Sequence, residues 1–164
     1  MMAPTPSQTV GPFFGFALPF EDDAKATAAD SRDAIRVEGQ VLDGAGEPVD
    51  DALVEASQGD QFARCRTDAE GAFHFTVRKP VVSDGAPFFN ITVFARGLLR
   101  HLQTRMYFPD EEDRANHGDR VLQLVDESRR RTLIAQPNRD ILRFDIRLQG
   151  EGAEGEGETV FFAV

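Results

Sequence analysis

Apolar and polar residues alternate with a period of two in several short stretches of this chain, and this alternation restricts the fold more than any other feature. The stretches Ile35 to Leu42, Phe73 to Val77 and Ile141 to Leu148 each show it. Successive side chains of a strand point to opposite faces of a sheet, so the pattern is typical of strands with one buried face. We therefore predict a strand at each of these three stretches.

Further apolar stretches lie between turn signals such as Asp43 to Gly46 and Asp68 to Gly71. They predict additional strands at 53–56, 64–67, 88–95, 104–108 and 159–164. The run at 88–95 is mostly apolar, which predicts burial on both faces, and residues 111–116 and 121–127 are predicted to form helical turns. Seven or eight short strands at even spacing, separated by turns, indicate an all-β sandwich.

The N-terminal segment has a composition of its own. Prolines at positions 4, 6 and 12 argue against a helix and favour an extended chain. Phe13, Phe14, Phe16 and Phe20 are more large apolar groups than a disordered tail normally carries. Residues 1–34 are thus predicted to be an arm and linker, with 21–34 as linker or helical turns, and 35–164 the β-sandwich domain. The arm should pack on its own domain or, as we expect, on a partner chain.

Charge and cysteine usage exclude several classes of protein. The chain has 18 Lys and Arg against 28 Asp and Glu, a formal charge of −10 that repels nucleic acid and anionic lipid. It has no basic segment followed by an apolar run at its start, and no run long enough to cross a membrane. Cys65 is the only cysteine, so no disulfide forms within the chain, which fits a cytoplasmic protein. We interpret Cys65 as an inert core residue.

The residues alone indicate no complete catalytic set. His74, His101 and His117 do not pair at metal-ligand spacing, and no nucleophile or metalloprotease motif is present. His74 is expected on a solvated face and His117 in a loop. Acidic clusters at 22–23 and 110–113 lack an ordered ligand spacing, so they are interpreted as solvated charges.

Three stretches resemble the intradiol ring-cleaving dioxygenases. They are Thr5 to Phe14 (TPSQTVGPFF), Phe88 to Gly97 with Thr104 to Phe108, and Arg131 to Ala135 with Leu142 to Gly150 and Glu158 to Phe162. The resemblance implies a single transthyretin-like β-sandwich with an extended N-terminal arm. It also implies a relationship to catalytic chains that hold Fe(III) with two Tyr and two His.

This chain departs from that ligand set. The family's His-x-His pair falls on Phe88 and Asn90, and the only tyrosine, Tyr107, falls where the family has no ligand. A phenyl ring cannot bind a metal and a neutral amide is a poor ligand for ferric iron. The resemblance therefore implies an iron-free α chain with no metal ligand and no catalytic residue of its own. Its partner would be an iron-bearing β chain.

For such a pair of chains, the resemblance implies protocatechuate and O2 as substrates and 3-carboxy-cis,cis-muconate as product, in the β-ketoadipate pathway of aromatic catabolism. It places Thr9, Gly11, Pro12 and Phe13 on an arm that lines the substrate pocket of the β chain. Phe13 stands where relatives commonly have Tyr. Arg96 matches an arginine near the mouth of that pocket.

Other interpretations stay open. The arm residues could serve only to hold an interface, and Arg96 could pair with an acidic side chain of its own domain. Arg143 and Arg147 are interpreted as solvated. The stretch between Leu53 and Arg64 is shorter than in relatives, with Ser57 where Trp is usual. The alternative function is a non-catalytic β-sandwich that binds or carries a ligand.

Overall fold

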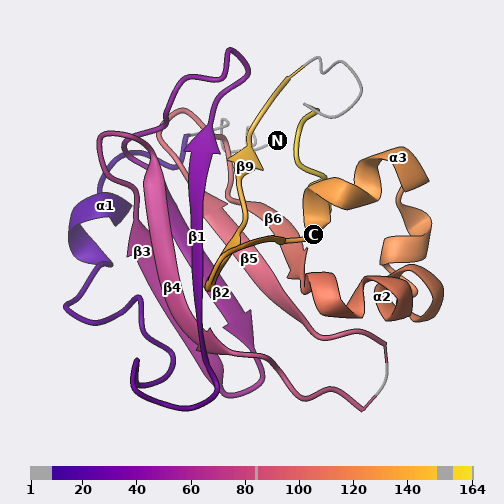
Figure 1. Ribbon diagram of the computed structural model, residues 1–164. Helices are drawn as coiled ribbons and strands as arrows, with labels where there is room; N and C mark the ends of the chain where they lie inside the picture. The colour runs from indigo at the N-terminus through magenta and orange to yellow at the C-terminus, as the bar shows by residue number, and fades with distance from the viewer. Residues whose placement is uncertain (1–8, 84, 151–156, 164) are drawn as a thin grey trace, which may run out of the picture.

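The computed structural model of the protein describes residues 9–83, 85–150 and 157–163, and its strands form two sheets (Figure 1). The strands are β1 (Ala34–Leu42), β2 (Leu53–Gln58), β3 (Gln61–Arg66), β4 (Ala72–Arg78), β5 (Phe88–Phe94), β6 (Leu102–Tyr107), β7 (Gln136–Asn138), β8 (Ile141–Arg143) and β9 (Ile146–Arg147). One sheet has the order β4-β1-β8-β7, with β9 also paired to β1, and the other has the order β3-β2-β5-β6. The predicted all-β sandwich is confirmed.

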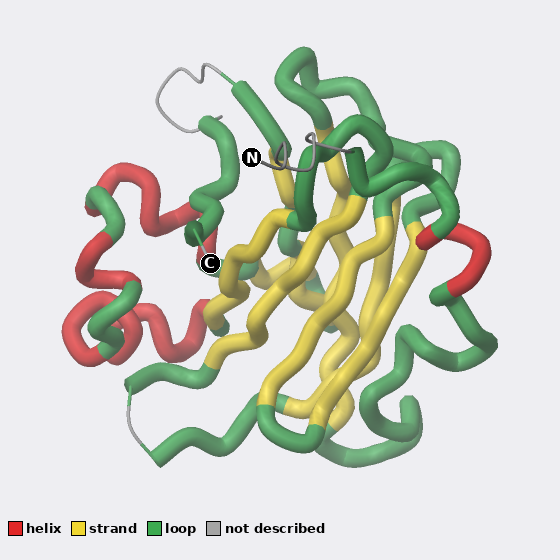
Figure 2. The backbone as a smooth tube through the Cα atoms, turned by 180° about the vertical axis from the view of Figure 1, so that it is seen from behind, coloured by secondary structure: helices red, strands yellow, loops and turns green. Residues whose placement is uncertain are grey.

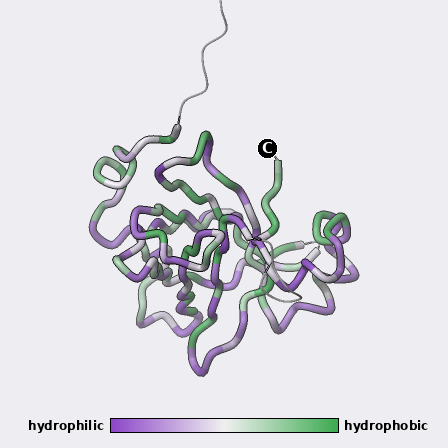
Figure 3. Tube along the Cα trace, turned by 90° about the horizontal axis from the view of Figure 1, so that it is seen from above, coloured by the Kyte–Doolittle hydropathy of each residue, from purple (hydrophilic) through white to green (hydrophobic). Residues whose placement is uncertain are grey.

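The main core lies between the two sheets. Val37 and Phe75 sit opposite each other in the antiparallel β1–β4 pair, and both are buried. Phe89, Ile91 and Val93 of β5 fill the core from the second sheet. Burying a side chain of this size contributes about 1.5–3 kcal/mol to stability. Figure 3 shows the resulting alternation of hydrophobic and hydrophilic residues along the chain.

Strand β5 is buried on one face only, so the prediction of two buried faces was wrong. Asn90 is exposed, and Phe88 and Phe94 are half-buried. Their side chains lie on the outer face of the second sheet, where the N-terminal arm and a helical segment cover only its two ends. A long apolar run cannot distinguish a second core from a surface that other segments partly cover.

The strand predicted from Ile141 to Leu148 is divided into β8 and β9. Both run parallel to β1, and between them the backbone N–H of Gln40 donates to the Asp145 side chain at 2.9 Å. At this point the Asp145 side chain takes the place of a backbone carbonyl as acceptor, which interrupts the ladder of backbone hydrogen bonds along β1. Gly39 of β1 faces the same crossing, where a Cβ would lie 1.8 Å from the carbonyl oxygen of Phe144. Only glycine allows this close approach.

A helical segment packs against one end of the second sheet. It comprises η1 (Pro109–Glu111), α2 (Glu112–Gly118), η2 (Leu122–Leu124), α3 (Glu127–Arg130) and η3 (Arg131–Leu133). Leu122 and Leu133 form a second buried cluster around Tyr107. Helical turns were predicted in this region, and Figure 2 shows them on the opposite side of the sandwich from α1. In the part of the chain that the structure describes, no helix is long and apolar enough to cross a membrane.

Both ends of the chain differ from prediction. Residues Phe14–Ala17 form a short helix, α1, with Phe13 as its N-cap, so Pro12 lies before the helix and does not interrupt it. Residues 21–33 form turns and no helix. The C-terminal residues 159–163 form no strand. They bind β6 through one backbone hydrogen bond, from Phe162 N to Gln103 O (2.8 Å), and one side-chain hydrogen bond, from Thr104 to Val160 O (2.7 Å), and these two bonds do not make a continuous ladder. Residue 164 and residues 1–8 lie outside the described residues.

Candidate functional site

The described start of the arm lies beside the turn that follows β5. The backbone N–H of Val10 donates to Leu98 O at 2.7 Å, which joins the arm to this turn. Gly11 has φ of +75°, a left-handed conformation that favours glycine and redirects the chain. Thr9, Pro12 and Phe13 are exposed. The structure thus brings the predicted arm residues next to the turn that carries Arg96.

Arg96 lies just beyond the end of β5 rather than inside it, and its side chain is 69% exposed. Its Nε atom lies 3.2 Å from Oδ2 of Asp51, a buried oxygen without a hydrogen bond from any described residue. An acidic partner within its own domain therefore exists. Among described residues, Asp51 is its only ion-pair partner, and most of the Arg96 side chain stays exposed.

The arm contacts its own domain along one side. The ring of Phe14 lies 6.0 Å from that of Phe94, and Arg64 donates from Nη1 to Leu18 O at 2.9 Å. Arg64 is itself held by Glu55 of β2, with 2.7 Å between Nη2 and Oε1. Three other phenylalanines of the arm are exposed, although the ring of Phe16 also lies 5.6 Å from the guanidinium carbon of Arg66. The exposed fractions are 80% for Phe13, 75% for Phe16 and 72% for Phe20.

The two positions that match the family's His-x-His ligands lie on the outer face of β5. The guanidinium carbon of Arg105 lies 4.0 Å from the centre of the Phe88 ring, a cation–π contact. Asn90 is exposed and sits opposite Arg105 in the antiparallel β5–β6 pair. The space beside these positions therefore already contains a fixed positive charge.

Arg105 is held by two further partners. Its Nη1 donates to the Tyr107 hydroxyl at 3.2 Å and lies 3.6 Å from Oδ1 of the buried Asp119. The same Asp119 oxygen accepts backbone N–H groups from Val121 and Leu122, at 2.9 and 3.0 Å. Burial raises the pKa of Tyr107 to about 12, so its phenol stays protonated. The cluster is a neutralised polar network with no site for a second cation.

Sequence reasoning missed Arg105 and Asp119. Arg105 could have been found, because it lies two residues before Tyr107 and so on the same face of the strand. Asp119 could not, because only the packing of the helical segment brings it to the sheet.

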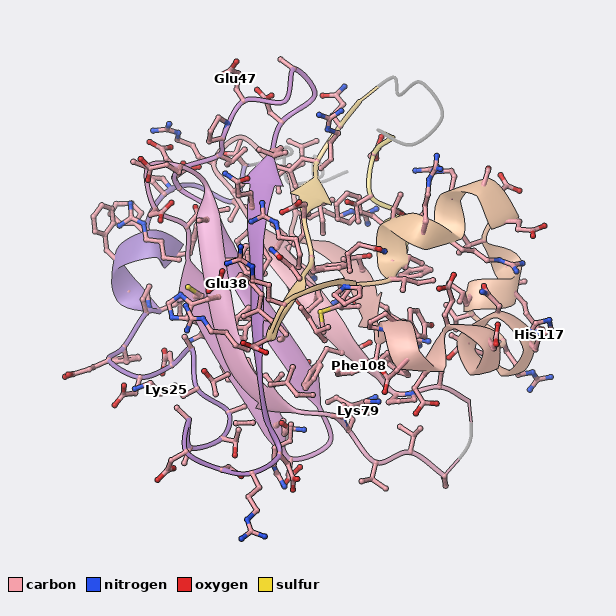
Figure 4. The ribbon with its side chains drawn as sticks, in the orientation of Figure 1. Lys25, Glu38, Glu47, Lys79, Phe108 and His117 are labelled. Atoms are coloured by element: carbon pink, nitrogen blue, oxygen red, sulfur yellow. The ribbon has the colours of Figure 1, made fainter. Side chains whose placement is uncertain are left out.

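The three histidines lie apart from one another. His74 of β4 is half-buried, and burial and the nearby Arg36 lower its pKa. The ring of His101 packs on Phe94, with 5.6 Å between ring centres. His117 lies in α2 rather than in a loop as predicted, and points away from the sheets (Figure 4). Within residues 9–83, 85–150 and 157–163, no group of three His, Cys, Asp or Glu side chains could hold a metal ion.

Cys65 is a half-buried residue of β3 that packs against the main core. Burial raises the pKa of its thiol. A protonated, partly buried thiol is a poor nucleophile, which agrees with the interpretation as an inert residue.

Several members of the acidic clusters have local partners. Asp22 pairs with Lys25 at 2.6 Å, and Asp110 pairs with Lys79. The Lys79 ammonium also lies 5.4 Å from the centre of the Phe108 ring. The two labelled residues are neighbours in Figure 4. These acidic residues serve surface ion pairs.

Two known proteins match nearly the whole chain. The protocatechuate 3,4-dioxygenase alpha chain of Burkholderia cepacia is 39% identical over 198 residues, covering 98% of this chain and 97% of that protein. The alpha chain of the same name from Pseudomonas putida is 39% identical over 202 residues, with 99% and 97% covered. These alignments are longer than the 164 residues of this chain, so the relatives contain segments that it lacks. No family model matches the chain.

Solved structures show the same fold. The dioxygenase domain of a carbohydrate-binding fusion protein from Streptomyces sp. SirexAA-E has a TM-score of 0.59 at 20% identity, covering 91% of this chain and all of that one. Hydroxyquinol 1,2-dioxygenase from Pseudomonas putida DLL-E4 has a TM-score of 0.54 at 21% identity, covering 96% and 63%. Identity along the whole length, together with this fold, places the chain in a family. It belongs to the protocatechuate 3,4-dioxygenase alpha chains, within the intradiol ring-cleaving dioxygenases.

Proposed function

We propose that this chain is the iron-free subunit of a hetero-oligomer that cleaves protocatechuate with O2 to 3-carboxy-cis,cis-muconate, and that a partner β chain holds the Fe(III). The identity to two proteins named as alpha chains of this enzyme supports the substrate and the partner. Ferric iron in this family activates the bound catecholate toward O2, and in our proposal that chemistry takes place on the partner chain.

The residues Phe88, Arg105, Tyr107 and Asp119, here called the Arg105 cluster, are the observation that supports placing the iron on the partner chain. The position of one histidine ligand is occupied by the phenyl ring of Phe88, and that of the other by the neutral amide of Asn90. The guanidinium of Arg105 covers Phe88 at 4.0 Å, and Tyr107 is buried with its proton retained. Phe88 and Asn90 do not fit a ferric ion, because neither offers an anionic or imidazole donor, and the carboxylate of Asp119 nearby is already paired with Arg105.

The chain's own contribution is to shape and charge the neighbouring pocket. Thr9, Gly11, Pro12 and Phe13 form an exposed bend that can approach the partner's substrate. Arg96 lies on the adjoining turn, and its side chain is largely exposed although its Nε lies beside Asp51. Its guanidinium can attract the carboxylate of protocatechuate, against a chain charge of −10.

The N-terminal arm is also suited to an interface with the partner chain. Phe14 anchors the arm of residues 9–34 to the second sheet, while the side chains of Phe13, Phe16 and Phe20 stay largely exposed. An apolar surface of this kind is suited to burial against another chain. We place the assembled enzyme in the cytoplasm, in line with the single cysteine.

Co-expression with the candidate β chain tests the proposal. We expect the two chains to co-purify as a coloured ferric complex with protocatechuate-dependent O2 uptake, and this chain alone to be colourless and inactive. As a matched variant, Phe88→His/Asn90→His in the complex should leave the iron content per pair of chains unchanged, because Arg105 remains in place. Failure to associate with the β chain, or iron-dependent turnover by this chain alone, would overturn the proposal.

A further inference from the structure

Arg64 of β3 joins the N-terminal arm to the second sheet through both its backbone and its side chain. The backbone N–H of Arg64 donates to Asp23 O at 2.7 Å, and its Nη1 donates to Leu18 O at 2.9 Å. The same Nη1 lies 3.8 Å from Oδ2 of Asp23. One residue of the sheet thus holds the arm at two points that follow α1 in the chain, and α1 lies beside β3 in Figure 1.

The guanidinium of Arg64 is itself fixed by the second sheet. Glu55 of β2 sits opposite Arg64 in the antiparallel β2–β3 pair, and its Oε1 accepts from Nε at 2.8 Å and lies 2.7 Å from Nη2. The two side chains are 18% and 17% exposed, so dissolved salt screens this ion pair weakly. The ring of Phe62 lies 5.0 Å from the guanidinium carbon. These contacts give the guanidinium one orientation, in which Nη1 points at the arm.

Helix α1 connects Leu18 to the bend that precedes the helix. The backbone N–H of Leu18 donates to Phe14 O at 3.2 Å. The backbone N–H of Gly15 donates to Pro12 O at 3.1 Å. Residues 12–18 therefore form one hydrogen-bonded unit, and a fixed Leu18 also restricts the position of Pro12.

The bend itself, residues 9–13, has little packing of its own. A Cβ built on Gly11 would meet no described atom within 4 Å apart from its chain neighbours, and residues 9, 12 and 13 are exposed. On the side away from α1, the backbone N–H of Val10 donates to Leu98 O at 2.7 Å. The position of the bend therefore depends on the anchors that flank it.

We propose that Arg64, oriented by Glu55, is a positioning residue for the substrate pocket of the partner chain. It acts through the arm, and the inference rests on the proposed function, in which the bend of residues 9–13 lines that pocket. The contact between the rings of Phe14 and Phe94 has no fixed direction, whereas the hydrogen bond to Leu18 O sets how α1 is oriented.

Millisecond hydrogen exchange of the full chain without its partner tests the anchor independently of activity. Arg64→Lys keeps a positive charge beside Glu55. A single ammonium group cannot replace a guanidinium that binds Glu55 and Leu18 O through different nitrogens. We expect the amides of residues 15–18 to exchange at least about fivefold faster, while the amides of β4 keep their protection.

Arg36→Lys is the matched control, because Arg36 pairs with Glu38 on the first sheet, with 2.6 Å between Nε and Oε1. It should leave the exchange at residues 15–18 unchanged. Glu55→Gln is a second variant of the anchor, since it removes the charge that orients Arg64 and keeps the size of the side chain. It should speed exchange at the same amides. Wild-type exchange rates in both anchor variants would refute the anchor.

Steady-state kinetics of the complex with the β chain test the positioning role. In Arg64→Lys the KM for protocatechuate should rise at least about threefold, with kcat within about twofold and the iron content unchanged, because the bend contributes to binding and not to the reacting centre. Arg36→Lys should show the KM of the wild type. Lack of turnover by the wild-type complex would refute the proposed function. An active wild type, faster exchange at residues 15–18 and an unchanged KM in Arg64→Lys would together refute the positioning role alone.

Discussion

The guanidinium of Arg105 lies over the ring of Phe88, with its carbon 4.0 Å from the ring centre, and the same guanidinium reaches the buried carboxylate of Asp119. The contact joins the outer face of the second sheet to the helical segment. It also places a protein cation beside a position where relatives of the family bind a metal through histidine.

Replacing Arg105 with Met should lower the free energy of unfolding by about 1–3 kcal/mol, because Asp119 stays buried without its cation and the cation–π contact is lost. The measurement is urea denaturation of the purified chain. Arg120→Met removes the same charge from an exposed neighbour of Asp119 and should cost less than about 0.5 kcal/mol. Equal effects of the two substitutions would show that the Arg105 cluster does not stabilise the fold.

The raised pKa of Tyr107 predicts that the stability of the fold depends on pH in the alkaline range. Its folded pKa of about 12 lies above the ordinary value of 10.0, so the folded state retains a proton that the unfolded state releases. The resulting stability is fully present below about pH 10 and is lost as the pH rises toward about 12, by about 2–3 kcal/mol in total.

The only tyrosine of the chain is Tyr107, and there is no tryptophan, so the ultraviolet absorbance of tyrosinate reports on this residue directly. Denaturation at several alkaline pH values should show the loss, and Tyr107→Phe should abolish this part of the slope. Titration of the folded phenol near pH 10 would contradict the prediction.

Gly39→Ala should be among the most damaging single substitutions in the sheet. The added methyl group would lie 1.8 Å from the carbonyl oxygen of Phe144, a contact that only a shift of the backbone can relieve. We expect a loss of more than about 3 kcal/mol, or insoluble protein. Gly118→Ala, where no atom lies within 4 Å of the added carbon, is the control and should be tolerated. Comparable denaturation midpoints for both variants would disprove the close approach.

Phe13 and Phe14 are neighbours with different expected roles. Phe14→Ala removes the contact with Phe94 and should destabilise the isolated chain by about 1–2 kcal/mol. Phe13 is 80% exposed, so Phe13→Ala should change the stability of the chain by less than about 0.5 kcal/mol. In the complex, however, Phe13→Ala should weaken association with the β chain or raise the KM for protocatechuate. Unchanged association and unchanged KM would argue that Phe13 has no role at the interface.

Arg96 and Asp51 allow the structural and the substrate-binding roles to be separated. Arg96→Ala should raise the KM for protocatechuate about fivefold or more without changing the iron content, because an attractive charge is lost. Asp51→Asn keeps the cation and removes its partner at 3.2 Å, so the KM should stay the same or fall. A purely structural role predicts the opposite result, namely similar losses of Tm in both variants and no change in KM.

Much of this protein was predictable from local sequence. The alternation at β1 and β4 marked the strands, because neighbouring side chains of a strand face opposite sides whatever they pack against. The substitution of Phe88 and Asn90 for histidine likewise argued against a metal before any geometry was known, because donor chemistry belongs to the residue itself. The family followed from the motifs at both ends of the chain.

Other features depended on contacts between residues distant in the sequence. Phe14 adopts a helical turn where it meets Phe94, Asp145 divides the predicted strand by bonding to Gln40, and β5 keeps one face outside the core. Arg96 proved to be exposed beside Asp51, which only the turn after β5 could determine.

The Arg105–Asp119 contact is of the same kind. It joins a strand to the helical segment, and periodicity within a strand carries no information about what packs across it. Local alternation thus determined which side chains face inward, whereas only tertiary packing decided which charges meet, because those distances depend on the arrangement of whole elements.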